Sequence, residues 1–350
     1  MRSALRTARR IAVIALAFMS SRGAAAQESR GPAGTLIVSN MNDNTATVLS
    51  AATGEVLATL PTGEGPHEVA ASHDGRWALV SNYGVRGKPG NSITVIDVAR
   101  HAVARTIELR DYQRPHGMAF LPGDSQFVVT SEVAKAILLV DFRTGNVVRA
   151  MPTNGRGSHM LAVSAAGDRM VTGDISDNAM SVLTLNGGEP RVIPVAHQPE
   201  GITIAPDGNS AWVGSNRDGV VLVVDTRSST VLDTLRGFGL PYRLAISADG
   251  RRAVITDPVK GTIRVFDVPT RRGRFTIDVP RDSLVATAEV PGSPSPEGVT
   301  IAPDSRWAFV TLQGRNRVVT IDLETGKIVG WAPTGTWSDG IAFSRVNSQP

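Results

Sequence analysis

The chain of 350 residues contains no cysteine. This absence excludes disulfide bonds, thiolate metal ligands and a cysteine nucleophile, and it rules out haem attachment through a CxxCH motif. The sequence also lacks a GxSxG elbow, a Walker A loop, an HExxH motif and a GxGxxG turn between a strand and a helix. Each of these motifs supports one particular chemistry. The most familiar catalytic and nucleotide-binding patterns are therefore missing.

Long apolar runs are missing as well. No segment is long and apolar enough to cross a membrane as a helix. The first 26 residues combine a basic start, a short apolar run from Ile11 to Met19 and the small residues Ala24, Ala25 and Ala26. This order is typical of a secretory signal peptide. We predict a signal peptide over residues 1–26, cleavage before Gln27, and a mature protein in the periplasm or outside the cell.

The mature chain has no excess of one charge. The whole sequence has 36 basic and 32 acidic residues and a formal charge of +4. Residues 1–26 hold five arginines and no acidic residue, which leaves 31 basic and 32 acidic residues and a formal charge of −1. Nucleic-acid binding is usually accompanied by a strongly basic surface. The composition therefore argues against DNA or RNA as a partner.

One short pattern does recur, seven times along the chain. Each copy has a turn residue, one variable and mostly polar residue, and then an alternating apolar run. The variable residues, here called the ring positions, are His67, His116, His159, Glu200, Tyr242, Glu297 and Asp339. They follow one another at steps of 49, 43, 41, 42, 55 and 42 residues. Steps of this length, with four strands in each, are typical of β-propellers.

A single period shows the four expected strands. They cover residues 201–205, 211–215, 220–225 and 231–235, and turn sequences such as Pro206-Asp207-Gly208 separate them. The chain opens on the second strand of a period, Thr35–Asn40, and ends on an unpartnered first strand, Gly340–Phe343. We predict that this last strand completes the first blade and closes the ring.

These observations define the predicted organisation. The fold is all-β, a seven-bladed β-propeller with four antiparallel strands in each blade. The propeller covers residues 34–344, after a short leader at 27–33, and a C-terminal tail covers 345–350. The continuous repeat favours one domain, because a single repeat cannot bury its apolar face alone.

Two stretches carry a family resemblance. GITIAPDG at residues 201–208, followed by WVGSN at 212–216, and VTIDLETGKIV at 319–329 resemble the YVTN-type repeat of exported YncE-like propellers. The resemblance covers residues 34–344. It implies an exported propeller and leaves the function open, since the family and its structural relatives include partner-binding surface proteins, DNA-binding periplasmic proteins, lactonase-like enzymes and metal-dependent lyases.

The ring positions are expected to lie together at one mouth of the central channel, because each precedes the innermost strand of its blade. Imidazole nitrogen and carboxylate oxygen are ligands for Zn²⁺, Mn²⁺ or Fe²⁺. The candidate metal ligands are His67, His116, His159, Glu200, Glu297 and Asp339. Among them, His116, His159 and Glu200 are candidate catalytic residues, through acid–base chemistry or a metal-bound water.

A purely structural explanation of the same pattern is open. Channel mouths are polar because they meet water, and proline and glycine beside the ring position have a backbone role. The six candidate ligands are also spread too widely to reach one ion. Polar residues at the ends of the second strands carry the same two interpretations, ligand contact or turn formation. They are Asn40, Asn82, Glu132, Asp174, Asn216, Asp257 and Gln313.

Two segments lengthen the regular period. Residues 83–91 extend a connection at the predicted mouth, and residues 269–292 lengthen the sixth step and carry four arginines. Both are also explained as solvated loops. Arginines at the mouth would attract an anionic ligand, and aromatic rings beside it would stack on one. The candidate ligand-binding residues are Arg86, Arg114, Tyr242, Arg243 and Trp337.

Two classes of function follow. The first is a binding module that holds a small molecule or a protein partner at the polar, histidine-rich mouth. The second is a metal-dependent lactonase-like hydrolase or lyase that uses the same mouth with a divalent Zn, Mn or Fe ion as cofactor. We expect a monomer in either case. Convergence of the histidine nitrogens on one point would favour the second class, and histidines spread into solvent would favour the first.

Overall fold

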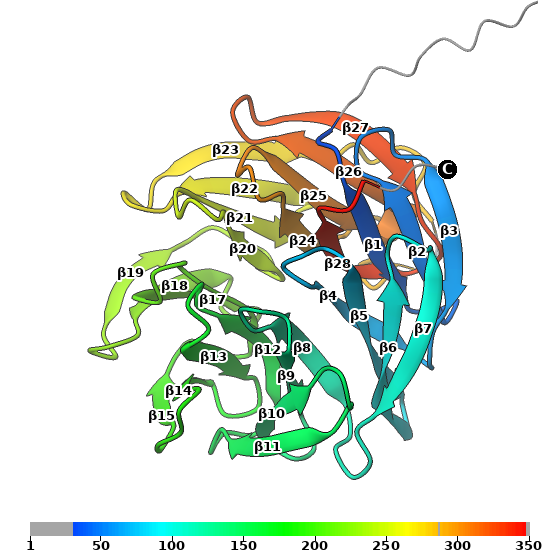
Figure 1. The fold of residues 1–350 in the computed structure, drawn as a ribbon. Helices are drawn as coiled ribbons and strands as arrows, with labels where there is room; N and C mark the ends of the chain where they lie inside the picture. The colour runs from blue at the N-terminus through cyan, green and yellow to red at the C-terminus, as the bar shows by residue number, and fades with distance from the viewer. Residues whose placement is uncertain (1–30, 286–287, 348–350) are drawn as a thin grey trace, which may run out of the picture.

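The computed structural model describes residues 31–285 and 288–347. Seven four-stranded antiparallel sheets surround a central channel (Figure 1). The predicted all-β, seven-bladed β-propeller is therefore confirmed. The predicted signal peptide lies outside the described residues. Within residues 31–285 and 288–347 the one helical element is the 3₁₀ turn η1 (Gln313–Arg315), and no helix there is long and apolar enough to span a membrane.

The blades are numbered from the N-terminus, and their strands are given from the channel outward. Blade 1 contains β28 (Ser338–Ser344), β1 (Thr35–Asn40), β2 (Thr45–Ser50) and β3 (Val56–Pro61). Blade 2 contains β4 (Pro66–Ala71), β5 (Trp77–Val85), β6 (Lys88–Asp97) and β7 (Ala102–Glu108). Blade 3 contains β8 (Pro115–Phe120), β9 (Gln126–Ser131), β10 (Ala136–Asp141) and β11 (Val147–Pro152).

The remaining blades follow the same order. Blade 4 contains β12 (Ser158–Val163), β13 (Arg169–Asp174), β14 (Ala179–Thr184) and β15 (Arg191–Pro194). Blade 5 contains β16 (Pro199–Ile204), β17 (Ser210–Ser215), β18 (Val220–Asp225) and β19 (Val231–Leu235). Blade 6 contains β20 (Leu244–Ile246), β21 (Arg252–Asp257), β22 (Thr262–Asp267) and β23 (Gly273–Asp278). Blade 7 contains β24 (Pro296–Ile301), β25 (Trp307–Leu312), β26 (Arg317–Asp322) and β27 (Lys327–Pro333).

The hydrophobic core lies between the blades. The second strands are buried along nearly their whole length because each sheet packs against a neighbouring blade on both faces. Between blades 2 and 3, for example, Leu79 and Ile93 share one apolar cluster with Phe127 and Val129. The outermost strands are largely accessible, as in β11 and β23, each of which has a single buried residue, Met151 and Ile277. Each blade thus depends on its neighbours for burial.

The C-terminal strand closes the ring. In blade 1, β28 pairs antiparallel with β1, with Phe343 opposite Leu36 and Ile341 opposite Val38. The N-terminal and C-terminal ends of the propeller therefore belong to one sheet (Figure 1). This pairing confirms the predicted closure, and it brings Asp339 into the ring of inner strands.

The two lengthened segments contain more strand than the sequence indicated. Within residues 269–292, Gly273–Asp278 forms β23, so only the residues after Asp278 make the extra connection. This strand is the fourth strand that the repeat requires in blade 6, and its apolar residues Phe275 and Ile277 alternate with polar ones. Residues 83–91 are not a loop but a hairpin, since β5 runs to Val85 and β6 starts at Lys88.

Deletion of residues 338–350 should abolish cooperative unfolding. The truncation removes β28, including the buried Ile341 and Ala342, and leaves one edge of β1 unpaired. We expect the resulting loss in the free energy of unfolding to be comparable to the whole stability of a typical domain, about 5–15 kcal/mol. Thermal unfolding followed by circular dichroism tests it, with deletion of residues 348–350 as the control. An unchanged melting profile in the longer truncation would contradict closure by β28.

Candidate functional site

A β-bulge at the ring position directs side chains into the channel. In blade 2, the register of β4 and β5 shifts so that His67 and Glu68 together stand opposite Ser81. The same shift recurs at the ring positions of blades 3, 4, 5 and 7. A bulge bends the strand and changes the direction of its side chains. Two adjacent residues of one blade can therefore both contribute polar groups to the centre.

Hydroxyl groups of the preceding blade hold the ring positions in place. Thr130 of β9 donates a hydrogen bond to the carbonyl oxygen of His159 at 2.7 Å, and Thr311 of β25 donates to that of Asp339 at 2.8 Å. Glycine after the ring position permits this close packing. A Cβ atom at Gly298 would lie 2.2 Å from the Asp339 carbonyl oxygen. The glycine after the ring position thus leaves room for the neighbouring backbone, while the ring position itself carries the polar side chain.

The three ring histidines lie together as a stack. The ring centroids of His116 and His159 are 3.8 Å apart at an interplanar angle of 30°, and those of His67 and His116 are 4.3 Å apart. Tyr83 packs its ring edge-on against both His67 and His116, each at 5.3 Å. His116 is fully buried between its neighbours. The histidines are neither spread into solvent nor arranged with all their nitrogens on one point.

His159 is clamped between two carboxylates. Its Nε2 lies 2.7 Å from Oε1 of Glu200, and its Nδ1 bonds to Oε1 of Glu132. Burial lowers the pKa of His159, but the two carboxylates outweigh burial and raise this pKa to about 10. Burial likewise raises the pKa of Glu200, but the positive charge of His159 holds it well below its ordinary range. At neutral pH the unit is therefore an imidazolium between two carboxylates.

Arg243 bridges the channel. Its Nη2 and Nε lie 2.7 and 3.0 Å from Oε1 of Glu68 in blade 2, and its Nη1 lies 2.8 Å from Oε1 of Glu200 in blade 5. The guanidinium also stacks on the Tyr242 ring at 4.1 Å from its centroid. Arg243 is only 3 % exposed. Its charge is therefore fully committed to two buried carboxylates from opposite parts of the ring.

The sequence contained a pattern that could have predicted the contact between Arg243 and Glu68. Glu68 and Arg243 both stand one residue after a ring position, and the other blades have Gly117, Met160, Gly201, Gly298 and Gly340 there. Two opposite charges thus replace small or apolar residues at equivalent positions. Comparison of this second column of the repeat would have identified Glu68 as a site residue.

A cavity of about 840 Å³ lies at the channel mouth. Many of the predicted site residues line it, and the full lining is Met41, His67, Arg86, His159, Glu200, Asn216, Leu240, Tyr242, Glu289, Trp337 and Asp339. A second cavity, of about 410 Å³, is lined by Glu68 and by residues further along the inner strands. Arg243 binds Glu200, which lines the first cavity, and Glu68, which lines the second.

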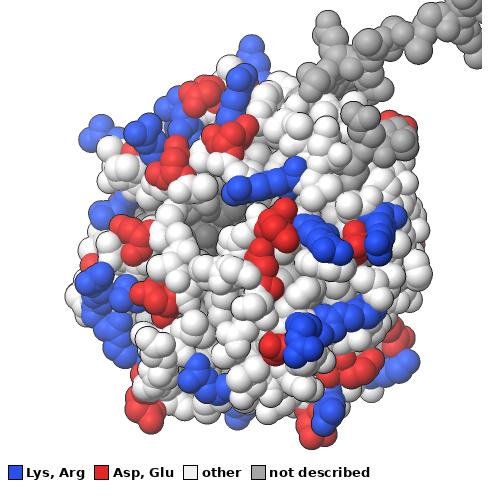
Figure 2. Space-filling model, viewed as in Figure 1, with Lys and Arg blue, Asp and Glu red and all other residues white. Residues whose placement is uncertain are grey.

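Arg114, predicted from the sequence to bind a ligand at the mouth, stacks on the Tyr83 ring at 4.6 Å from its centroid and does not line the mouth cavity. The exposed Arg156 pairs with Asp177 at 2.7 Å. Of the arginines named from the sequence, Arg86 lines the mouth cavity. Lys, Arg, Asp and Glu are mixed over the face drawn in Figure 2, without one extended area of a single sign.

Carboxyl groups gather where blade 7 meets blade 1. Oδ2 of Asp339 lies 2.7 Å from Nδ1 of His67. Glu297 is buried and accepts a hydrogen bond from Ser295 at 2.6 Å, and burial together with the nearby Asp339 raises the pKa of Glu297 well above its ordinary value. Glu289, which the sequence did not single out, reaches the mouth cavity from the connection after β23. The lengthened sixth step thus supplies a residue to the site.

Most polar residues at the ends of the second strands serve local structure. Asn82 bonds to Ser92 and Thr94, and Asp257 accepts hydrogen bonds from the backbone of Gly239 and Leu240. Glu132 differs, because it bonds to both His159 and Tyr83 at the channel. Asn216 also lines the mouth cavity.

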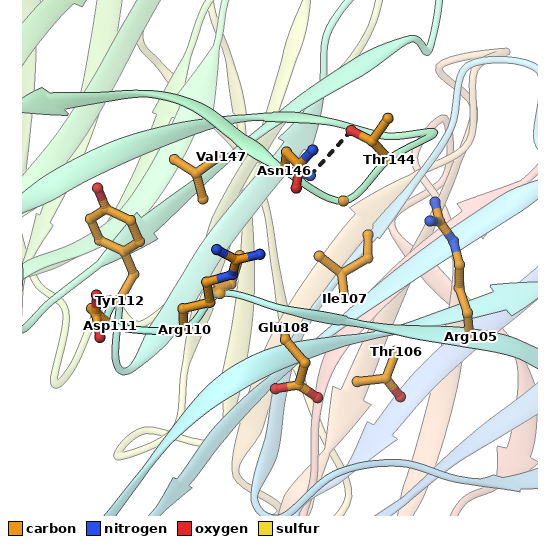
Figure 3. A pocket seen from close by; sticks show the side chains of 12 residues that line it. Arg105, Thr106, Ile107, Glu108, Arg110, Asp111, Tyr112, Thr144, Asn146 and Val147 are labelled. Atoms are coloured by element: carbon orange, nitrogen blue, oxygen red, sulfur yellow. Dashed lines mark hydrogen bonds between the residues drawn. The ribbon is translucent and has the colours of Figure 1, made fainter.

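A further cavity of about 450 Å³ lies at the rim between blades 2 and 3 (Figure 3). Residues 105–112 of β7 and its following turn line one side, and residues 144–147 line the other. Among the described residues, the groups of three His, Asp or Glu side chains close enough to share an ion lie at the channel instead. The mouth cavity is larger and holds the convergent polar groups, so it is the better candidate site.

Comparisons with known proteins support the fold alone. No family model matches the chain, and no curated protein matches it. A functionally unknown protein from Desulfotomaculum acetoxidans is similar in structure, with a TM-score of 0.72, 16% identity, and coverage of 89% of this chain and 99% of the other. Hydrazine synthase from Kuenenia stuttgartiensis has a TM-score of 0.67 and 19% identity, over 84% of this chain and 94% of the other. The class defined by fold and site is a seven-bladed propeller with a polar, partly closed channel.

Replacement of Arg243 by methionine should destabilise the fold by about 3–5 kcal/mol, because it leaves the buried Glu68 and Glu200 without their shared cation. Urea unfolding measures the loss, and Glu68→Gln combined with Arg243→Met should recover part of it. Arg100→Met is the control, since Arg100 is exposed and lies 3.9 Å from Asp97. A loss below about 1 kcal/mol would show that the bridge is not needed for stability.

The stability contributed by Asp174 should depend on pH. Burial raises its pKa to about 6 despite hydrogen bonds from Ser181 and Ser158, whereas an unfolded aspartate has a pKa of about 3.9. The folded state therefore keeps a proton that the unfolded state loses, and the free energy of unfolding falls as pH rises from about 4 to 6. The accumulated loss above pH 6 is roughly 2–3 kcal/mol.

We expect Asp174→Asn to be more stable than the unaltered protein at pH 8 and to have no such advantage at pH 4. Urea unfolding at both pH values measures the difference. Asp177→Asn is the matched control, because the Asp177 side chain is only partly buried, at 27 % exposed, and its pKa is lowered by Arg156. Equal effects of Asp174→Asn at the two pH values would contradict the assignment.

Proposed function

We propose that the protein is an exported β-propeller that binds a small zwitterion of the amino-acid type in the mouth cavity. The observation that carries the proposal is a pair of unmatched charges. Among the described residues, Arg86 and Glu289 both line the cavity without an ion-pair partner, and their charges are opposite. Export and membership of the YVTN-type propellers rest on the sequence patterns, as does the expectation of a monomer.

The other charges of the lining are paired with one another. His67 lies against Asp339, and His159 lies between Glu200 and Glu132. A ligand with one excess charge would therefore leave either Arg86 or Glu289 unmatched, whereas a zwitterion satisfies both. Specific pockets for small molecules usually have volumes of about 300–1,000 Å³, and the volume of about 840 Å³ falls within that range.

Each part of such a ligand has a partner in the cavity. The ammonium group fits Glu289, which is exposed at the mouth. Partial loss of hydration and the neighbouring Asp339 and Glu200 raise the pKa of Glu289, which indicates a negative potential there. The carboxylate fits Arg86, whose planar guanidinium binds carboxylates in a bidentate manner. Apolar parts of the ligand can pack against Met41, Leu240 and Trp337.

A second candidate function, the metal-dependent hydrolase or lyase, is favoured by one observation. Two groups of two histidines and one glutamate lie at the channel within reach of an ion. The arrangement does not indicate a particular bond to be cleaved. We therefore develop the metal site below and leave the reaction unassigned.

Calorimetric titration with leucine, isopentylamine and 4-methylpentanoate tests the zwitterion proposal, because the last two carry only one of the two charges. Phenylalanine, glutamate and lysine extend the series. We expect binding of at least one amino acid, and at least tenfold weaker binding by Glu289→Gln and by Arg86→Gln, since a charge-assisted hydrogen bond contributes about 1.5–3 kcal/mol.

The control is Arg100→Gln, which changes an exposed arginine in the turn between β6 and β7 and should bind like the unaltered protein. If isopentylamine bound as tightly as leucine, the ligand would be a simple cation rather than a zwitterion. Binding that is insensitive to both Glu289→Gln and Arg86→Gln would overturn the proposal, as would no binding of any amino acid.

A further inference from the structure

We propose that His67, Glu68 and His116 bind a divalent first-row transition-metal ion in the wall between the two channel cavities. One donor atom from each of the three side chains lies within 4.8 Å of the other two. All three residues are buried, with exposed fractions of 9 %, 8 % and 0 %. This site goes beyond the zwitterion site and does not depend on it, because Arg86 and Glu289 take no part.

The donor set suits such an ion. Two imidazoles and one carboxylate form the ligand set of one type of catalytic zinc site and of the facial triad that binds Fe²⁺. Two ligands of a tetrahedral zinc ion, each at about 2.1 Å, lie about 3.4 Å apart. The donor atoms therefore need to close in by up to about 1.4 Å from the observed limit of 4.8 Å, which side-chain rotation can supply. Three protein ligands also leave a coordination position for water or another ligand.

His116 supplies the strongest observation. Neither of its ring nitrogens has a hydrogen-bond partner among the described residues, although the residue is fully buried. Nearly all buried polar side-chain atoms in proteins have such a partner, so an exception requires an explanation. Coordination of an ion by one nitrogen would satisfy a group that the surrounding protein leaves unpaired.

The neighbours of His67 and Glu68 leave donor atoms available. Nδ1 of His67 lies 2.7 Å from Oδ2 of Asp339, close enough to pair but not aligned as a hydrogen bond. A small rotation of the ring would align them, with Nε2 then acting as the ligand, as is usual for a metal-bound histidine held by a carboxylate. Of the two carboxylate oxygens of Glu68, only Oε1 accepts hydrogen bonds from Arg243, so Oε2 takes no part in that ion pair.

The second group of this kind, His116, Glu132 and His159, is less suited to an ion. Nδ1 of His159 already bonds to Glu132, and Nε2 bonds to Glu200. An ion at this group would have to displace one of these contacts. The observations therefore favour the group that contains His67, with His116 as the ligand common to both.

Titration of the chelator-treated mature chain with Co²⁺ and with Zn²⁺ tests the site. We expect one ion per chain, a visible absorption spectrum of low-symmetry Co²⁺, and a rise in melting temperature with Zn²⁺. His116→Ala should weaken Zn²⁺ binding at least 100-fold. His197→Ala is the matched control, since His197 is exposed on the same face and pairs with Asp218, and it should bind normally.

The outcomes separate the alternatives. Loss of binding in His159→Gln, with retention in His67→Gln, would move the ion to the second group and overturn the assignment. No binding of either metal to the unaltered protein would overturn the site altogether, however the variants fold, and would leave the histidines as a structural stack. Amino-acid titrations on the same samples test the zwitterion site independently of the metal site. Glu289→Gln should keep full metal binding, and His116→Ala should keep amino-acid binding.

Discussion

Pairing of β28 with β1 is the interaction on which the channel depends. It joins segments from the two ends of the chain into one sheet, and it places Asp339 beside His67. Without that pairing, β1 would have a free edge and the inner strands would not form a complete ring. The ring in turn brings side chains from distant parts of the sequence within contact distance. Glu68 and Arg243, which are 175 residues apart in the sequence, are a further case.

Burial of several charges at the ring requires that they neutralise one another. Arg243 is shared by Glu68 and Glu200, and His159 is shared by Glu200 and Glu132. A buried carboxylate without a cation would be costly, so these contacts form one network rather than independent pairs. At Glu297, burial and the nearby Asp339 outweigh the positive charge of Arg243, and the pKa rises instead. The network closes the channel and defines the mouth cavity that we propose as the ligand site.

Predictions from the sequence were most successful where the pattern repeats. The positions of the strands, the number of blades and the closure by the last strand all followed from seven comparable copies. The four-strand repeat required a fourth strand in blade 6, but the length of the sixth step left its bounds open, and the structure places it at Gly273–Asp278 as β23. Glu289 could not be found because it lies in the part of the sixth step that has no counterpart in the other repeats.

The sequence by itself determined the architecture, since alternation of apolar residues and turn signals at a constant period leaves few ways to bury every blade. It also indicated that polar residues would gather at one mouth. Only the tertiary structure decided how they pair. Whether Arg243 faces a ligand or two glutamates, and whether three histidines stack or converge, depends on distances across the channel. Those distances are set by the bulges and the packing of seven inner strands, and no local pattern in the chain encodes them.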